Sequence, residues 1–266
     1  MYRIMLMFAT GWQYAGVLAR AALATPLIIL RLLGMGSMAR RMAENIVVKW
    51  GAWSIRTLDC KVEIQGQEHV PMEGPLVVMA NHQSMFDIPL VIHAVGRSAG
   101  YVAKNSLFRV PGIAFWLRTT HSISMNRSDN LSGGRALQAH SQFLRDKNAC
   151  LIIFPEGTRT RDENGVIQPF RRGSVRLAEP SNLPILPVAI DGTRHLGNYG
   201  PMKATRKGGR LIRVKIGPVR HVQTMNAPER KAFMDSLEAE IRQYWEEIKL
   251  DWPAPTTDDN ANKPND

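Results

Sequence analysis

Two kinds of apolar pattern divide the chain. Short apolar runs bounded by glycine, proline or polar residues are typical of buried strands, and apolar residues three or four positions apart are typical of helices. The predicted strands are centred on Val62–Ile64, Leu76–Ala80, Tyr101–Lys104, His121–Met125, Cys150–Phe154, Leu183–Ile190 and Leu211–Ile216. The predicted helices cover 36 to 57, 88 to 94, 132 to 145 and 226 to 248, with a brief apolar segment at Ile113–Leu117 and a helical stretch ending near Ala178. Strands that alternate with helices predict an α/β fold, a layered sheet flanked by helices.

The most apolar part of the chain lies before this pattern, at residues 4 to 34. A cleaved signal peptide is disfavoured, because Arg20 falls where such a segment is uncharged. A single membrane-spanning helix would place Arg20 near its middle, at a cost of about 2.5–3.5 kcal/mol. Two short apolar helices that lie in one leaflet of a bilayer fit the pattern better, and a buried helical hairpin in a soluble domain is the alternative. The basic flank at Arg40, Arg41 and Lys49 favours the cytoplasmic face.

These patterns predict three regions. Residues 1–58 form an apolar, helical membrane-attachment region, and residues 59–250 form the α/β domain. The sequence from 251 to 266 is rich in Pro, Thr, Asp and Asn and is predicted to be a disordered tail.

Composition narrows the choice of partner. The chain of 266 residues has 34 Lys and Arg against 23 Asp and Glu, a formal net charge of +11. Such a balance favours anionic partners, among them nucleic acid, phospholipid surfaces and phosphorylated substrates. Aromatic residues are not interleaved with the basic ones as in RNA-binding modules, so nucleic acid is not expected. Cys60 and Cys150 have no metal-ligand spacing and read as buried apolar residues.

A histidine and an aspartate follow the strand predicted at Leu76–Ala80. His82 comes two residues after the strand, and Asp87 comes five residues after His82. A neutral imidazole can deprotonate an alcohol when a carboxylate bonds its other nitrogen, which fixes the tautomer and stabilises the imidazolium. A loop that turns into a helix could fold these two side chains onto each other. The plainer alternative is that Ser84 caps the next helix, that Ser84 and Asp87 form a capping box, and that His82 is an ordinary loop histidine.

Charged residues also follow other predicted strands. Lys104 and Arg127 come after two of them, and Glu156-Gly157-Thr158-Arg159 comes after Cys150–Phe154. Arginine binds phosphate through two parallel hydrogen bonds, and a glycine turn allows the backbone to approach a ligand. Ligands of open α/β sheets bind at the strand ends, so a phosphate site is predicted there. Each arginine taken singly is more often a solvated surface charge than a ligand.

Three motifs resemble those of the glycerolipid acyltransferases. Asn81-His82-Gln83-Ser84-Met85-Phe86-Asp87 matches their Asn-His-x4-Asp signature, Phe154–Arg159 matches their phosphate-site block, and Leu183–Val188 resembles their proline-containing block. All three stand in the family's order, and the resemblance covers about residues 60 to 220. Ser124-Met125-Asn126-Arg127 keeps the arginine of another family block but has Asn126 where aspartate is usual. The forms of the motifs look most like those of enzymes that acylate 1-acyl-sn-glycerol-3-phosphate.

The resemblance implies an activity and roles. His82, oriented by Asp87, would deprotonate the free hydroxyl of lysophosphatidate, which would attack the thioester of acyl-CoA or acyl-carrier protein and give phosphatidate. Arg127 and Arg159 would hold the acceptor phosphate, assisted by Lys104, while Glu156, Gly157 and Thr158 would shape the glycerol site. No metal or cofactor is implied. The setting would be the cytoplasmic face of the inner membrane, on the phospholipid surface.

Other functions stay open at this point. The same reaction could use another acceptor, such as a lyso-aminolipid or glycerol-3-phosphate, and Asn126 leaves room for this. A non-catalytic protein that binds lipid phosphate would not need the His82–Asp87 pair. A phosphohydrolase would need a metal cluster or a nucleophile, and neither is evident in the sequence.

Overall fold

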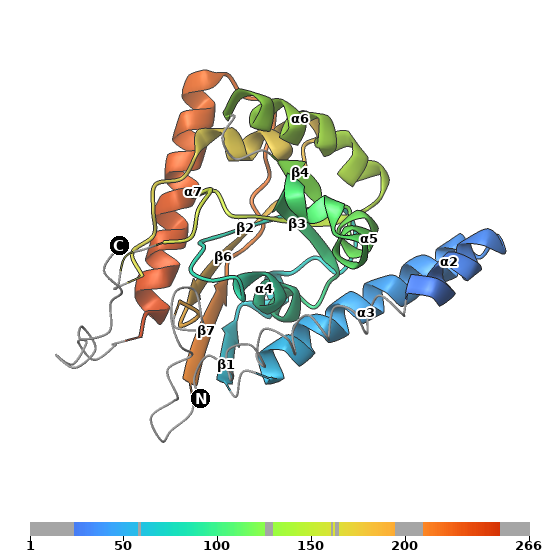
Figure 1. Ribbon diagram of the computed structural model, residues 1–266. Helices are drawn as coiled ribbons and strands as arrows, with labels where there is room; N and C mark the ends of the chain where they lie inside the picture. Colours follow the sequence, from blue (N-terminus) through green and yellow to red (C-terminus); the bar gives the residue numbers. More distant parts are fainter. Residues whose placement is uncertain are drawn as a thin grey trace, which may run out of the picture.

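The computed structural model describes residues 24–57, 60–125, 130–160, 162, 165–194 and 210–250. The predictions made for residues 4 to 23, for Arg127 and for the C-terminal tail lie outside the described residues. Within them the chain forms a mixed sheet with helices on both faces (Figure 1). The α/β fold predicted from the pattern is confirmed.

The described part of the chain forms a seven-stranded sheet in the order β1-β7-β6-β2-β5-β3-β4. Its strands are β1 (Cys60–Gln65), β2 (Leu76–Ala80), β3 (Ala99–Lys104), β4 (Ile123–Met125), β5 (Cys150–Ile153), β6 (Ile185–Asp191) and β7 (Arg210–Ile216). Strand β2 pairs in parallel with β5 on one side and β6 on the other. Strand β7 runs antiparallel to β6 and parallel to β1. The carboxyl ends of β2, β5 and β6 therefore meet at one edge of the sheet, which we call the carboxyl edge.

Helices cover both faces of this sheet. They are α2 (Ala24–Leu32), α3 (Gly36–Arg56), α4 (Asp87–Val95), α5 (Pro111–Thr119), α6 (Asn130–Asp146) and α7 (Ala227–Ile248), with short 3₁₀ turns η1 (Gln67–His69), η2 (Asn105–Arg109), η3 (Arg172–Leu177) and η4 (Glu179–Ser181). Helix α7 begins with the capping box of Asn226 and Glu229 that its sequence favours.

The structure assigns one segment and corrects two local predictions. Ile113–Leu117, for which the sequence predicted no element, is part of helix α5, because Pro111 supplies a favourable first helical position. The stretch before Ala178 is the 3₁₀ turn η3. Ser84 does not cap the helix after it: α4 begins at Asp87, and the Ser84 hydroxyl accepts from the Phe86 amide at 3.2 Å. That contact closes a tight turn, which delays the start of the helix.

Strand β2 lies at the centre of the core. Its five residues are fully buried, as expected of a parallel strand covered on both faces. Leu76, Val78 and Ala80 belong to the apolar cluster under α3 and α4. Val77 and Met79 belong to the cluster under α6 and α7. The polar residues that follow β2 are therefore attached to the most rigid part of the domain.

Helices α2 and α3 meet in a hairpin that extends beyond the sheet (Figure 1). Leu27 packs against Ala39 and Ala43, which joins the two helices. Large apolar side chains on this hairpin stay exposed, namely Ile28, Ile29, Leu32, Leu33, Met35, Met38 and Met42, and Leu32 is 82% exposed. Among the described residues, no helix has the length and apolar character needed to cross a bilayer.

Candidate active site

Asn81 joins the end of β2 to its neighbour β6. Its side-chain Nδ2 donates to the Ile190 carbonyl at 2.9 Å, and the Ile190 amide donates to Asn81 Oδ1 at 2.7 Å. The amide side chain thus takes the place of a backbone group beyond the last residue of β2. This pairing fixes the point at which the chain leaves the sheet, directly before His82.

His82 and Asp87 contact each other inside the protein. His82 Nδ1 lies 2.7 Å from Asp87 Oδ2, and Asp87 is fully buried. The same oxygen accepts the backbone amides of Gln83 at 2.6 Å and Ser84 at 2.8 Å. A carboxylate held by these donors accepts the Nδ1 hydrogen, which leaves a lone pair on Nε2. Among the described residues, no hydrogen-bond partner occupies Nε2, so His82 has the arrangement of a general base.

The imidazole of His82 rests on the ring of Phe154. The two ring centroids are 4.0 Å apart, and the ring planes differ by 11°. Phe154 directly follows β5, the strand beside β2. Stacking on an aromatic face holds the orientation of the imidazole and stabilises a positive charge on it.

The carboxyl group of Glu156 accepts a hydrogen bond from the backbone of the same histidine. Its Oε1 accepts the His82 amide at 2.6 Å, and its Oε2 accepts the Gln168 amide at 2.7 Å. Burial raises the pKa of Glu156 to about 7, although both amide hydrogen bonds act to lower it. Both carboxyl oxygens of Glu156 thus bind backbone amides of the protein itself, a role that the sequence did not suggest.

Basic residues surround the turn after Glu156. Gly157 has a φ of +72°, and a Cβ placed on it would lie 2.6 Å from Arg171 Nε. The absence of a side chain thus lets the Arg171 guanidinium lie over the turn. Arg159 is half-buried, while Thr158 and Arg171 are exposed. Lys104 is exposed at the end of β3, on the same edge of the sheet.

The carboxyl edge brings together His82, Asp87, Glu156 and Gly157, and Arg127 lies outside the described residues. Comparisons with known proteins identify related sequences and structures. Residues 61–191 match the model of a protein family described as Acyltransferase. Residues 61–191 form an acyltransferase-family domain. The match includes the His82–Asp87 pair, the turn at Gly157 and all of β6.

Individual relatives of the chain have related names. It is 31% identical over 156 residues to a chloroplastic 1-acyl-sn-glycerol-3-phosphate acyltransferase of Brassica napus, which covers 58% of this chain and 44% of that protein. It is 30% identical over 205 residues to one of Chlamydomonas reinhardtii, which covers 76% of this chain and 60% of that protein. The chain thus spans about half the length of these curated relatives. The crystal structure of a 1-acyl-sn-glycerophosphate acyltransferase from Thermotoga maritima superposes with a TM-score of 0.75 at 26% identity, which covers 95% of this chain and 100% of that one.

The acyltransferase domain also has site residues that the sequence did not reveal. Thr193 and Gln83 lie beside Asp87 and are fully buried. Asp191 accepts from Gln83 Nε2 at 2.9 Å and from Trp245 Nε1 at 3.2 Å. The available signal was weak: Asp191-Gly192-Thr193 is polar and follows an apolar strand, as Asn81 and Glu156 do.

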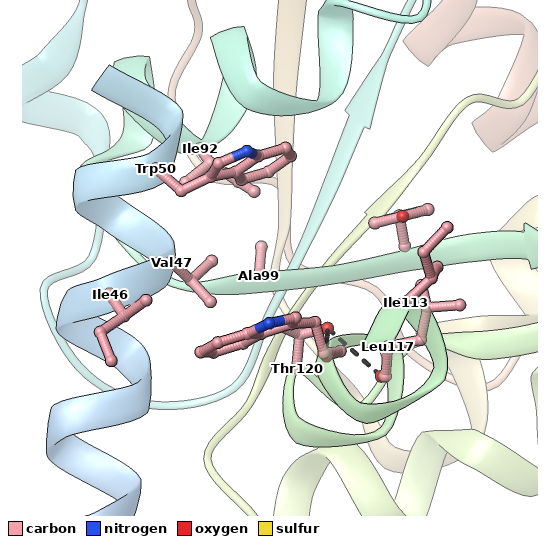
Figure 2. Close-up of a pocket in the computed structure, with 10 residues that line it drawn as sticks. Ile46, Val47, Trp50, Ile92, Ala99, Ile113, Leu117 and Thr120 are labelled. Carbon is pink, nitrogen blue, oxygen red and sulfur yellow. Dashed lines mark hydrogen bonds between the residues drawn. The ribbon is translucent and has the colours of Figure 1, made fainter. Parts of the chain in front are cut away.

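An apolar cavity lies on the α3 side of the acyltransferase sheet (Figure 2). Its volume is about 110 Å³. The lining comes from α3, α4, β3 and α5 and consists of Ile46, Val47, Trp50, Ile92, Ala99, Tyr101, Ile113, Trp116, Leu117 and Thr120. Tyr101 and Trp116 pack against the same apolar cluster as Phe154, which stacks on His82. The cavity is thus linked to the site by continuous apolar packing.

Proposed function

We propose that this protein transfers an acyl group from a thioester to the free hydroxyl of 1-acyl-sn-glycerol-3-phosphate and so makes phosphatidate. The observation that carries the proposal is the 2.7 Å contact between His82 Nδ1 and the buried carboxylate of Asp87. His82 and Asp87 lie within the segment that matches the family, and relatives of this chain are named 1-acyl-sn-glycerol-3-phosphate acyltransferases. A binding protein would have no use for a base oriented in this way.

The reaction follows from the geometry of the pair. His82 Nε2 removes the hydroxyl proton as the glycerol oxygen attacks the thioester carbonyl carbon. The carbon–sulfur bond then breaks, and the sulfur leaves with the proton that the imidazolium returns. Asp87 stabilises the imidazolium between these two transfers. General base catalysis contributes roughly 10²–10⁴-fold, so the positioning of both substrates supplies the rest.

The acceptor phosphate is assigned to the basic residues of the carboxyl edge. Lys104 ends β3, Arg159 lies in the loop after the neighbouring strand β5, and Arg171 lies over Gly157. Guanidinium groups bind phosphate in a bidentate manner. Arg127 is proposed for the same role from its sequence motif, and Glu156, Gly157 and Thr158 would form the glycerol side of the site.

The acyl chain is assigned to the apolar side of the site. The cavity in Figure 2 is lined by aliphatic and aromatic side chains, and it shares its packing cluster with Phe154. Burial of an acyl chain there would contribute about 0.8 kcal/mol for each methylene removed from water. Acyl-CoA and acyl-carrier protein remain the two candidate donors, and no cofactor is proposed.

The phospholipid surface is the proposed partner of the α2–α3 hairpin. Ile29, Leu32 and Leu33 expose apolar surface, and Arg40 and Arg41 lie near this apolar tip on α3. Apolar insertion beside basic residues is typical of interfacial helices on anionic lipid. The proposed setting is the cytoplasmic face of the inner membrane, where lysophosphatidate and phosphatidate reside.

An acyl-transfer assay tests the proposal. Purified protein in detergent micelles receives radiolabelled lysophosphatidate and either acyl-CoA or acyl-carrier protein. We expect phosphatidate from the parent, a rate lower by roughly 10²–10⁴-fold from His82→Ala, and unchanged lysophosphatidate binding, because the imidazole acts on the hydroxyl and not on the phosphate. His221→Ala, a change at an exposed histidine, should keep the parent rate.

Two outcomes would overturn the assignment. Transfer only to another lysolipid would retain the chemistry and reject this acceptor. Binding of lysophosphatidate without transfer to any acceptor would reject the enzyme and leave a lipid-phosphate-binding protein.

A further inference from the structure

The second oxygen of the Asp87 carboxylate has a partner of its own. Thr193 Oγ1 donates to Asp87 Oδ1 at 2.5 Å, and both residues are fully buried. Asp87 Oδ2 accepts from His82, Gln83 and Ser84. All of those donors come from the loop after β2, whereas Thr193 comes from the end of β6. The carboxylate is thus held from two separate parts of the chain.

A glycine turn brings Thr193 to this position. Gly192 follows β6 with a φ of +99°, a conformation that residues with a Cβ rarely adopt. A Cβ on Gly192 would lie 2.5 Å from the Leu211 carbonyl oxygen, so the turn passes directly over β7. The turn directs the next residue, Thr193, back toward Asp87.

The residue before the turn is anchored as firmly. Asp191 accepts from Trp245 Nε1 at 3.2 Å and from the Leu250 amide at 2.9 Å, both at the end of α7. Its Oδ1 also accepts from Gln83 Nε2 at 2.9 Å. The segment 191–193 therefore connects the C-terminal helix to the loop that carries His82.

The Thr193 hydroxyl supplies a hydrogen bond to the second oxygen of the Asp87 carboxylate. A carboxylate with donors on one oxygen only can turn about its Cβ–Cγ bond, because that torsion is broad. Thr193 Oγ1 also lies 3.4 Å from a second acceptor, Gln83 Oε1. Asp87 Oδ1 is the nearer acceptor, at 2.5 Å, and belongs to a carboxylate, so the single hydroxyl hydrogen of Thr193 is directed to it. A hydrogen bond at that oxygen would keep Oδ2 in line with His82 Nδ1.

We propose that Thr193 is a positioning residue for the base, acting on His82 through Asp87. The inference rests on the proposed acyl transfer and adds a member to its machinery. In the sequence Thr193 lies 106 residues after Asp87. It falls outside every motif that the sequence analysis identified.

The test compares Thr193→Val with Thr193→Ser in the acyl-transfer assay. Valine keeps the shape and removes the hydroxyl, so kcat should fall roughly 10- to 100-fold, the scale of a misplaced catalytic group. The KM for lysophosphatidate should stay within about twofold, because Thr193 does not touch the phosphate residues. Serine restores the hydroxyl and should return kcat to within about threefold of the parent.

A matched control and a second variant keep the result decisive. Thr57→Val removes a hydroxyl that donates only to the Ser54 carbonyl of its own helix, and it should keep the parent kcat. If Thr193→Val does not fold, Thr193→Ala replaces it. The same result is expected of that variant, a lower kcat with an almost unchanged KM for lysophosphatidate. A parent kcat in the valine variant overturns the inference, as does a rise in KM alone or a serine variant as impaired as the valine one. A parent without transfer overturns the proposed function instead, so the two failures are distinguishable.

Discussion

The side-chain amide of Asn81 forms hydrogen bonds with both backbone groups of Ile190, as a neighbouring strand residue would. Asn81 is 1% exposed, so water cannot replace either bond. The change Asn81→Asp keeps the acceptor and removes the donor. It leaves the Ile190 carbonyl facing a carboxylate, and we expect the free energy of unfolding to fall by about 2–3 kcal/mol. Chemical denaturation at pH 7 measures this loss.

Asn226 provides the matched control for that change. It caps α7 by accepting the Glu229 amide at 2.9 Å, a role in which its side chain only accepts. Asparagine and aspartate are about equal at this position, so Asn226→Asp should change stability by less than about 0.5 kcal/mol. Equal losses of stability in Asn81→Asp and Asn226→Asp would show that the hydrogen bond donated by Asn81 does not account for the effect.

The buried carboxyl group of Glu156 predicts a pH dependence of stability. Its pKa is raised from 4.5 to about 7, chiefly by burial. A group whose pKa is higher in the folded state stabilises the fold fully below its unfolded pKa. That contribution is lost as the pH rises through the folded pKa. Between pH 5 and 7 this carboxyl group should therefore lower stability with increasing pH, by at most about 1.4 kcal/mol per pH unit.

Denaturation curves for the parent and for Glu156→Gln at several pH values isolate this contribution. From pH 5 to pH 8 the free energy of unfolding of the parent should fall relative to that of Glu156→Gln. For Glu179→Gln the difference from the parent should stay constant from pH 5 to pH 8, because hydrogen bonds from Arg230 lower the pKa of Glu179, so that its contribution changes only at more acidic pH. Its contribution is present above the unfolded pKa and is lost as the pH falls through the folded value. A constant difference across the range for Glu156→Gln would contradict the raised pKa.

The turn at Gly157 predicts an effect on the acceptor. In Gly157→Ala the new methyl group would meet the Arg171 guanidinium at 2.6–2.8 Å, and alanine disfavours a φ of +72°. Arg171 must move, so the KM for lysophosphatidate should rise by about tenfold or more, on the scale of one lost charged hydrogen bond. Steady-state kinetics with varied lysophosphatidate measures this change.

The variant Gly96→Ala distinguishes the contact with Arg171 from the backbone strain of a positive φ. Gly96 has a similar φ of +66°, ends α4, and has open space where a Cβ would be. Gly96→Ala should cost about 1 kcal/mol of stability without a change in KM. A KM as high as that of the Gly157 variant would assign the effect to strain rather than to Arg171.

The parts of the site that the sequence predicted are those encoded in short segments. The strand Leu76–Ala80 was predictable because five apolar residues stop at Asn81, and the His82–Asp87 pair lies within one loop. The roles of Asn81 and Thr193 were not predictable, because each depends on a partner more than 100 residues away. The same holds for Glu156, whose partners are backbone amides that reveal nothing in a sequence. The capping role considered for Ser84 was wrong, because its hydroxyl accepts from the Phe86 amide and closes a tight turn before α4.

The placement of β6 has a consequence for the order in which the protein acquires activity. A chain synthesised only as far as residue 183 already contains His82, Asp87 and the turn at Gly157. It still lacks the strand that holds Asn81 and the threonine that holds Asp87. Long-range pairing of parallel strands is slow, because a long loop must close before any contact compensates for it. Activity should therefore appear only after the C-terminal third has been synthesised and has docked, which makes turnover a late reporter of folding.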